Sequence, residues 1–143
     1  MQPSTLPKWN PDARLTTEQL REELKKKKPG GSSPTSQLTR AVLATLHVHG
    51  FNAWRNNNVG VYDAKLGKHR ANSAKKGVSD VIGFREGCGR WAAVEVKVGE
   101  DKLSDEQTAF LADIKRAGGF AFECRDNTDA LLIALRQWLA QFK

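Results

Sequence analysis

The chain has 143 residues, of which 39% are hydrophobic and 27% are charged. It is long enough for one domain with its own core and too apolar to be wholly disordered. No run of the sequence approaches the ~20 apolar residues that a membrane helix needs, and the N-terminal residues lack the apolar segment of a signal peptide. These features exclude membrane-spanning, collagen-like and secreted disulfide-rich proteins. The formal net charge of +7 favours contact with a polyanion such as nucleic acid.

Residues 1–33 are expected to form a basic, flexible tail. Several prolines interrupt it, and the run over 25–33 combines four lysines with Pro, Gly and Ser. A capping-box pattern at 16–19 predicts a short helix over 17–28. The lysine run is either a solvated segment or a direct contact to nucleic acid, and the sequence leaves both open.

Beyond the tail, the hydrophobic spacing alternates between helical and strand periods. Gly50 fits the left-handed end of a helix, Ser104 to Gln107 match a capping box, and Gly118-Gly119 stop the helix that it opens. The expected elements are a helix over 38–49, strands over 51–55, 78–84 and 91–97, a helix over 104–117, a strand over 120–124 and a helix over 127–142. Residues 56–76 are expected to be a polar loop, in which a short strand around 59–61 is the alternative. The order α–β–β–β–α–β–α indicates the α/β class.

Cysteine and histidine residues give no metal-binding pattern. Cys88 and Cys124 are far apart, and reduced thiols of a cytosolic protein are expected, with a single disulfide as the alternative. His47 and His49 are two positions apart and point to different faces of a helix, so they form no ligand set with His69.

The two strands over 78–84 and 91–97 are predicted to pair as a hairpin. A turn centred between Gly87 and Cys88 places Asp80 opposite Glu95, and directly opposite residues share a face of the sheet. Lys97 lies two residues beyond Glu95 and therefore on the same face. Two facing carboxylates repel each other, so stability alone does not predict this arrangement.

A divalent cation between the carboxylates would remove the repulsion. Mg²⁺ is typically held by one or two carboxylates and by substrate phosphate oxygens, and an adjacent lysine can orient the attacking water. The alternative is that Asp80 and Glu95 are surface residues and that Lys97 pairs with one of them.

Four segments stand in a fixed order along the chain: Gly77-Val78-Ser79-Asp80-Val81-Ile82-Gly83, Ala93-Val94-Glu95-Val96-Lys97, Leu103-Ser104-Asp105-Glu106-Gln107 and Gly118-Gly119. Together they resemble the VRR-NUC domain. This domain is a branch of the PD-(D/E)XK nuclease superfamily, found alone in phages and bacteria and as the nuclease module of the Fanconi-associated nuclease. The resemblance covers about residues 35–135.

The resemblance implies a restriction-endonuclease-like core, with a mixed central β-sheet flanked by helices, formed by residues 34–143. It implies that Asp80 and Glu95 are metal ligands, that the backbone carbonyl of Val96 is a further ligand, and that Lys97 is the catalytic lysine. The activity it implies is that of a Mg²⁺- or Mn²⁺-dependent endonuclease acting on DNA, with Holliday junctions or flaps as substrates. It also implies a homodimer in the cytoplasm of a bacterial or phage-infected cell.

Gln107 is implied to face the site as a fourth catalytic residue. Its alternative is to act as the capping-box partner of Ser104, and one side chain is not expected to fill both positions easily.

One departure from the family pattern concerns the first core helix, where the family usually has an acidic residue. No Asp or Glu occurs between Glu23 and Asp63. Thr35, Ser36 or Gln37 is expected to supply a neutral oxygen instead, and Gln37 is the candidate replacement. The missing acid puts a second metal ion in doubt, and it leaves a non-catalytic DNA-binding module as the alternative function.

Basic and polar residues around the predicted loop are the candidate DNA contacts. Phosphate contacts of this kind bind without regard to sequence and weaken as salt rises. The candidates are Arg55, Asn56, Asn57, Lys65, Lys68, Arg70, Lys75, Lys76 and Lys102. A solvated loop tip is the alternative. Tyr62 or Trp54 could stack on an unpaired base, although a buried strand position is the expectation for Trp54.

Overall fold

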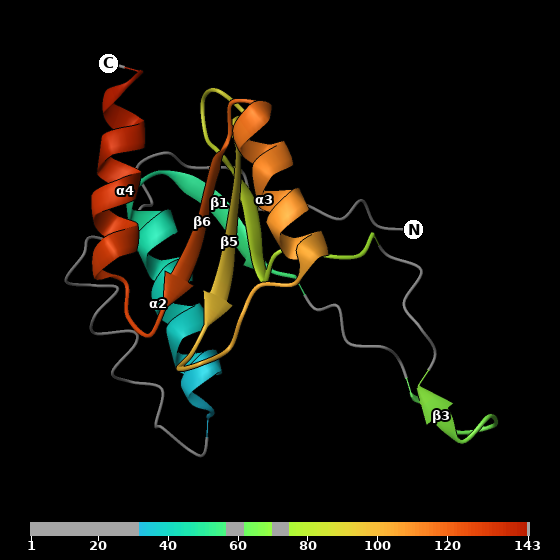
Figure 1. Cartoon of the computed structure of the whole chain (residues 1–143). Coiled ribbons are helices and arrows are strands. Elements are labelled where there is room, and N and C mark those ends of the chain that lie inside the picture. The colour runs from blue at the N-terminus through green and yellow to red at the C-terminus, as the bar shows by residue number, and fades with distance from the viewer. Residues whose placement is uncertain (1–31, 57–61, 70–74, 143) are drawn as a thin grey trace, which may run out of the picture. The chain divides into compact units, whose positions relative to one another are not determined.

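The computed structural model describes residues 32–56, 62–69 and 75–142 (Figure 1). Contacts within the chain separate a unit over Met1–Gly30 from a unit over Gly31–Lys143, and the described residues belong to the second. The predicted helix over 17–28, almost all of the predicted tail over 1–33 and the alternative strand at 59–61 lie outside the described residues.

Four strands form one mixed sheet in the order β1-β4-β5-β6. Their bounds are Phe51–Arg55 for β1, Val81–Arg85 for β4, Trp91–Lys97 for β5 and Phe120–Arg125 for β6. β4 pairs antiparallel with both β1 and β5, whereas β5 and β6 are parallel. Helix α3 (Asp105–Arg116) supplies the crossover that a parallel pair requires. The sheet and the order of its elements confirm the predicted restriction-endonuclease-like α/β core.

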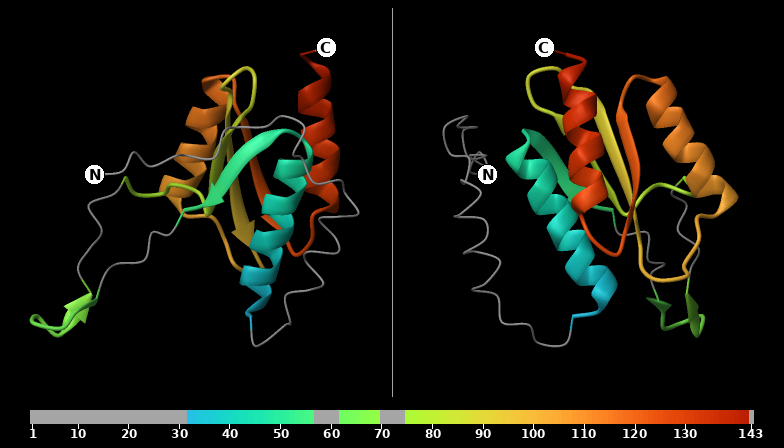
Figure 2. Two further views of the ribbon diagram at one scale, coloured as in Figure 1. Left: turned by 180° about the vertical axis from the view of Figure 1, so that it is seen from behind. Right: turned by 60° about the vertical axis from the view of Figure 1, so that its left-hand side comes forward.

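Helices cover both faces of the sheet (Figures 1 and 2). α2 (Pro34–Val48) and α4 (Asp129–Ala140) pack on one face, and α3 packs on the other. Alternation along β5 divides the core, because Ala92, Val94 and Val96 point to α2 and α4 whereas Ala93 points to α3. The sheet is therefore buried on both sides over most of β5.

Helix α2 begins four residues earlier than its apolar spacing predicts. The hydroxyl of Ser33 accepts a hydrogen bond from the backbone N–H of Ser36 at 3.2 Å, and Pro34 occupies the first turn, where it needs no donor. At the other end Gly50 has φ +83°, which confirms the predicted left-handed stop.

A short hairpin lies within the segment that was predicted to be a loop. β2 (Tyr62–Asp63) and β3 (Lys68–His69) pair antiparallel, with a turn between them in which Gly67 has φ +61°. The rings of Tyr62 and His69 contact each other at 5.2 Å between centroids. The loop prediction is wrong here because a ladder of two residues on each side is too short to give a readable alternation.

The expectation of a buried Trp54 is also wrong, since 41% of this residue is exposed. Trp54 lies on β1, one of the two edge strands of the sheet, and α3 packs against β5 and β6 at the other edge. A strand pattern shows that a residue is in a sheet, but it does not show which strand is at the edge.

Both cysteines are free thiols, as predicted, with Cys88 exposed and Cys124 buried. Among the described residues, no helix is long and apolar enough to cross a membrane.

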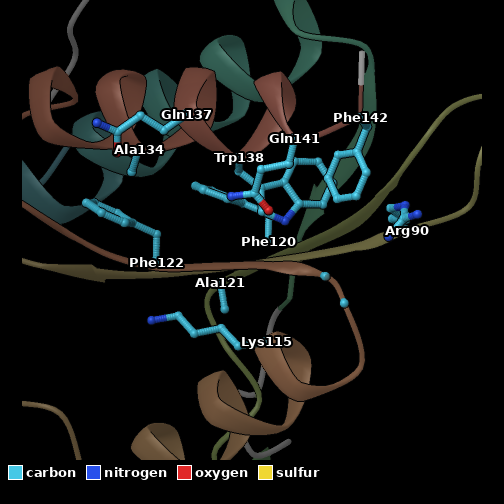
Figure 3. Close-up of a pocket in the computed structure, with 12 residues that line it drawn as sticks. Arg90, Lys115, Phe120, Ala121, Phe122, Ala134, Gln137, Trp138, Gln141 and Phe142 are labelled. Atoms are coloured by element: carbon cyan, nitrogen blue, oxygen red, sulfur yellow. The ribbon is translucent and has the colours of Figure 1, made fainter.

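A cavity of about 650 Å³ lies beside the outer edge of β6, between α4 and the end of α3 (Figure 3). Phe120, Phe122, Trp138 and Phe142 line its apolar part, and the Arg90 guanidinium lies 4.0 Å from the centre of the Phe142 ring. No residue of the predicted metal site lines this cavity, so it is a separate feature of the fold.

Candidate active site

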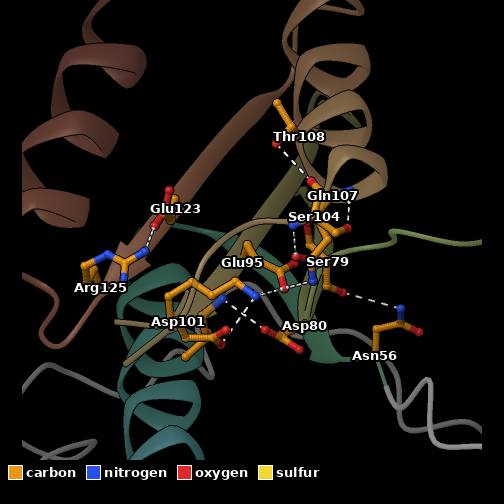
Figure 4. A network of polar contacts seen from close by, with 12 residues as sticks. Asn56, Ser79, Asp80, Glu95, Asp101, Ser104, Gln107, Thr108, Glu123 and Arg125 are labelled. Atoms are coloured by element: carbon orange, nitrogen blue, oxygen red, sulfur yellow. Dashed lines mark hydrogen bonds and ion pairs between the residues drawn. The ribbon is translucent and has the colours of Figure 1, made fainter. Parts of the chain in front are cut away.

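The pairing of β4 with β5 has the predicted register. Val81 lies opposite Val94 and Ile82 lies opposite Ala93, so the next pair along the hairpin is Asp80 and Glu95. Residues that alternate along β5 share a face, which places Lys97 beside Glu95. Asp80 and Glu95 lie near each other at the end of the hairpin that is away from its turn (Figure 4), and Lys97 Nζ lies 3.5 Å from Glu95 Oε1.

Asp80 is held on both of its sides. Its carboxylate oxygen Oδ2 accepts a hydrogen bond from the backbone N–H of Val96 at 3.0 Å. Its backbone carbonyl accepts one from the N–H of Asn56 at 2.8 Å. Asp80, which precedes β4, is therefore bonded both to β5 and to the residue that follows β1. The side chain of Asp80 is therefore fixed toward β5, on the same side as Glu95.

Glu95 is almost completely buried, with 1% of its surface exposed. Its oxygen Oε1 accepts a hydrogen bond from Gln107 Nε2 and lies 3.5 Å from Lys97 Nζ. Oxygen Oε2 is buried and has no hydrogen-bond partner among the described residues. A buried acceptor without a partner costs about 1–3 kcal/mol, and more when it carries charge. Within the described residues, Oε2 is therefore left without a donor at normal hydrogen-bond distance.

The protonation of Glu95 reflects the same deficit. Burial, and to a lesser degree the negative charge of Asp80, raise the pKa of its carboxyl to about 7, while Lys97 acts in the opposite direction. Removal of a carboxylate from water disfavours its charged form, and a neighbouring carboxylate adds to that effect. A single ammonium does not offset both causes.

Lys97 is buried, with 7% of its surface exposed, and its ammonium lies between two carboxylates. Its Nζ is 3.5 Å from Glu95 Oε1 and 3.5 Å from Asp101 Oδ2. Asp101 was not among the residues selected from the sequence. Its position four residues after Lys97 could have indicated it, but only if the intervening segment were known to turn back toward the strand.

That turn is fastened to the end of β6. The N–H of Gly99 donates to Asp126 Oδ1 at 2.7 Å, and Arg125 Nη1 donates to the carbonyl of Gly99 at 2.6 Å. Arg125 also pairs with Glu123 (Figure 4). Asp126 adopts φ +61°, a conformation that Asp tolerates better than most residues. The parallel neighbour strand thus holds the segment that carries Asp101.

Gln107 fills both of the positions that the sequence presented as alternatives. Its Oε1 accepts a hydrogen bond from the N–H of Ser104 at 2.9 Å and completes the capping box, while its Nε2 donates to Glu95. The expectation that one side chain could not easily do both is wrong, because an amide carries an acceptor and two donors on different atoms. The start of α3 is thereby joined directly to the Glu95 carboxylate.

The segment leading to Asp80 lies tightly against α3. At Gly77, whose φ is +78°, an added Cβ would lie 2.5 Å from the carbonyl carbon of Glu106. Ser79, which was not selected from the sequence, is fully buried, its hydroxyl has no partner among the described residues, and its carbonyl accepts from Asn56 Nδ2 at 3.4 Å. Only glycine allows the chain to approach α3 so closely at position 77. This close approach sets the position from which the chain runs to Asp80.

Gln37 is not brought to the carboxylates. Its amide donates to the carbonyl of Ser32 at 3.0 Å. Its side chain lines a surface depression with residues 126–128, which does not include Asp80 or Glu95. The structure therefore shows no contact through which Gln37 replaces the missing acid.

The candidate DNA contacts within the described residues lie mostly at the surface. Asn56 is half-buried beside Asp80, and the other described candidates are exposed: Arg55, Lys65, Lys68, Lys75, Lys76 and Lys102. Lys75 is 4.0 Å from Asp113 and lies over the Phe110 ring, which places the 75–77 segment along α3. Asn57 and Arg70 lie outside the described residues.

The carboxylate oxygens of Asp80 and Glu95 fit a divalent metal ion as ligands. Among the described residues there is no group of three or more His, Cys, Asp and Glu side chains placed to hold one. Asp80 and Glu95 nevertheless form a pair of carboxylates, and Mg²⁺ commonly uses one or two carboxylates with water and phosphate oxygens as its other ligands. The partnerless Glu95 Oε2 is the atom that such an ion would satisfy.

The mixed sheet with helices on both faces is that of a restriction-endonuclease-like fold, and Asp80, Glu95 and Lys97 lie together at one end of its β4-β5 hairpin. The chain matches the VRR-NUC domain over residues 34–127 and belongs to this family. Searches of curated proteins and of solved structures gave no match. Membership indicates a nuclease-family function in DNA processing, for which DNA is the implied substrate and a divalent metal is the typical cofactor.

Proposed function

We propose that the protein is a divalent-metal-dependent endonuclease that hydrolyses phosphodiester bonds in DNA. The observation that carries the proposal is the buried carboxyl of Glu95, whose Oε2 has no hydrogen-bond partner among the described residues and whose pKa is raised by burial and by the neighbouring Asp80. A purely structural carboxylate would be expected to have both of its oxygens satisfied.

Each side chain of the site has a separate task. Asp80, Glu95 and the carbonyl of Val96 would hold Mg²⁺ or Mn²⁺, and such an ion polarises a phosphoryl oxygen and lowers the pKa of a bound water. Gln107 occupies Glu95 Oε1 and so leaves Oε2 for the ion.

Lys97 is proposed to orient the attacking water and to stabilise negative charge that develops on the phosphate. An ammonium has three donors, and two of them face Glu95 and Asp101. The third is available to a water or a phosphate oxygen. Because both carboxylates restrain the ammonium, it is already in place before the substrate binds.

The substrate preference and the assembly are proposed from the family resemblance. We expect selectivity for branched DNA such as a Holliday junction or a flap. A junction has two strands to cut, so a homodimer is expected, and sedimentation of the full chain with and without junction DNA tests it. The site of action that accompanies this proposal is the cytoplasm of a bacterial or phage-infected cell.

The experiment that tests the function is a cleavage assay. Labelled four-way junction, 5′ flap, linear duplex and single strand are incubated with EDTA, Mg²⁺ or Mn²⁺. We expect cleavage only with metal, and at least a hundred-fold loss in Lys97→Ala, since removal of one charge-stabilising donor typically costs about 10²–10³ in rate. Lys115→Ala is the matched control, because this exposed lysine is in the last turn of α3, away from Ser104 and Gln107.

A DNA-binding module without catalysis is the second candidate. One observation favours it, since no third acidic ligand accompanies Asp80 and Glu95 in the described residues. It predicts that DNA binding survives Glu95→Ala and that titration with Mn²⁺ releases no heat. Cleavage by the wild type with any metal excludes it.

A further inference from the structure

The exposed Trp54 lies in the row of side chains next to the carboxylates. The strand register places Trp54 opposite Ile82, and Ile82 opposite Ala93. Two residues further along, the backbone of Asn56 bonds to Asp80, which precedes β4 at the level of Glu95. Alternate residues share a face, and two residues advance a strand by about 7 Å. Trp54 is therefore on the face of the sheet that carries the active site, one row away from it.

In the described part of the chain, no helix covers the ring of Trp54. Ile82 and Ala93 pack with Leu111 and its neighbours on α3. Trp54 remains 41% exposed on the edge strand β1. Its ring contacts that of Phe84 edge-on at 6.3 Å between centroids, which supports the indole without hiding it.

Exposure alone does not require a function, because single apolar side chains are common on protein surfaces. The position of this one next to the carboxylates is what carries the argument. A phosphate held between Asp80, Glu95 and Lys97 brings an adjoining nucleotide to the neighbouring surface. An accessible aromatic ring there offers its face to any base, because every base has a π-face.

We infer that Trp54 is a stacking platform for an unpaired base beside the cleaved phosphate. The inference rests on the proposed nuclease function and names the class of substrate for that site: DNA with an unstacked base next to the cut. Fully paired duplex is disfavoured, because its bases must first leave the stack, and this costs energy. Flaps, branch points and single strands already provide such a base.

The first test measures binding without metal, so that no cleavage is needed. Single-stranded oligonucleotides carrying 2-aminopurine report stacking through quenching of their fluorescence. Wild type and Trp54→Phe are expected to quench it, and Trp54→Ala is expected to lose the quenching and bind about ten-fold more weakly, as alanine substitution does at other stacking sites. Equal affinity and quenching in wild type and Trp54→Ala would overturn the inference.

Trp91→Ala is the matched control. Trp91 is 49% exposed on the same face, but it begins β5, four residues before Glu95. It is expected to bind and quench as the wild type does. If Trp54→Ala and Trp91→Ala lose affinity and quenching equally, DNA binding depends on the apolar face in general and not on stacking at Trp54. This result would also overturn the inference.

A second test separates the inference from the proposed function. The ratio of flap to duplex cleavage rates is measured for wild type and the Trp54 variants, with thermal unfolding as a check of folding. We expect the ratio to fall about ten-fold in Trp54→Ala and to return in Trp54→Phe. If no wild-type cleavage occurs, the nuclease proposal fails while the fluorescence test still decides on stacking. If the wild type cuts and the ratio is unchanged in Trp54→Ala, only the inference on Trp54 fails.

Discussion

Glu95 is a buried carboxyl whose charge is disfavoured by burial and by Asp80 and favoured by Lys97. One of its oxygens is bound by Gln107 and faces Lys97, and the other has no partner in the described part of the chain. Burial and the neighbouring Asp80 raise the pKa of this carboxyl to about 7 in spite of Lys97, so the group is only partly ionised near neutral pH. Such a combination of burial and specific charge partners is typical of functional sites.

Cys124 shows what burial does where no function is indicated. Its thiol is fully buried and donates to the carbonyl of Asn127 at 3.2 Å, and burial raises its pKa to about 11. We predict that only Cys88, which is exposed, reacts with a thiol reagent at pH 8 in the folded protein. Labelling counted by mass spectrometry checks this, and reaction of Cys124 in folded Cys88→Ser would contradict it.

The same shift predicts a loss of stability at high pH. Because the pKa of the folded thiol lies above its ordinary value near 9, the contribution of Cys124 is complete below pH 9 and is lost as pH rises toward 11. The loss is on the order of 2 kcal/mol. Denaturant unfolding of wild type and Cys124→Ala between pH 8 and 11 tests it, since the two curves should converge only if the thiol is responsible.

At the scale of elements, the position of the site depends on how closely a loop approaches a helix. Gly77 leads into Asp80, and an added Cβ there would lie 2.5 Å from the backbone of Glu106. We predict that Gly77→Ala lowers the free energy of unfolding by about 2–4 kcal/mol, because it combines an unfavourable positive φ with a backbone clash. Denaturant titration measures the loss.

Gly87→Ala is the matched control for this prediction. Gly87 has φ +85° but no atom within 4 Å of an added Cβ, so it has the cost of the conformation without the clash. Its loss is expected to be about 1 kcal/mol. Equal losses in the two variants would show that the approach of the loop to α3 is not a tight one.

The elements also show what a sequence reveals and what it withholds. The hairpin register was predictable because a turn at Gly87 and Cys88 fixes every pair up to Asp80 and Glu95. The order of strands along the chain does not show which strand lies at the edge of the sheet. The exposure of Trp54 on the edge strand β1 was therefore not predictable from the sequence. The position of Asp101 depends on hydrogen bonds between Gly99 and residues 125 and 126, which are remote in the sequence.

The sequence predicts both contacts of Gln107 as alternatives, whereas in the structure its side chain makes both at once. The capping-box pattern predicted its contact with Ser104, and the family resemblance implied that it faces the site. What the pattern could not show is the distance between the start of α3 and β5, which allows one amide to reach both groups. Packing between elements, rather than the spacing within one of them, decides such double roles.

At the scale of the whole molecule, the formal charge of +7 predicts binding to DNA that weakens with salt. Each phosphate contact contributes about 0.9 to the slope of log K against log salt on duplex DNA and about 0.7 on a single strand. The charge acts only where it meets the DNA, so individual lysines should differ. Lys76 is exposed in the segment that leads to Asp80, whereas Lys115 is at the far end of α3.

We therefore predict that Lys76→Ala reduces the slope by about 0.7–0.9 and that Lys115→Ala leaves it unchanged. Lys75→Ala should have a smaller effect, because the Lys75 ammonium already lies 4.0 Å from Asp113 and would exchange one anion for another. By contrast, hydrogen bonds are the main causes of the lowered pKa of Glu106, and Lys76 is only the smallest. Fluorescence anisotropy in EDTA at several salt concentrations measures all three slopes without cleavage. If Lys115→Ala lowers the slope as much as Lys76→Ala does, the net charge of the molecule drives binding, and the surface beside the carboxylates is not its particular contact.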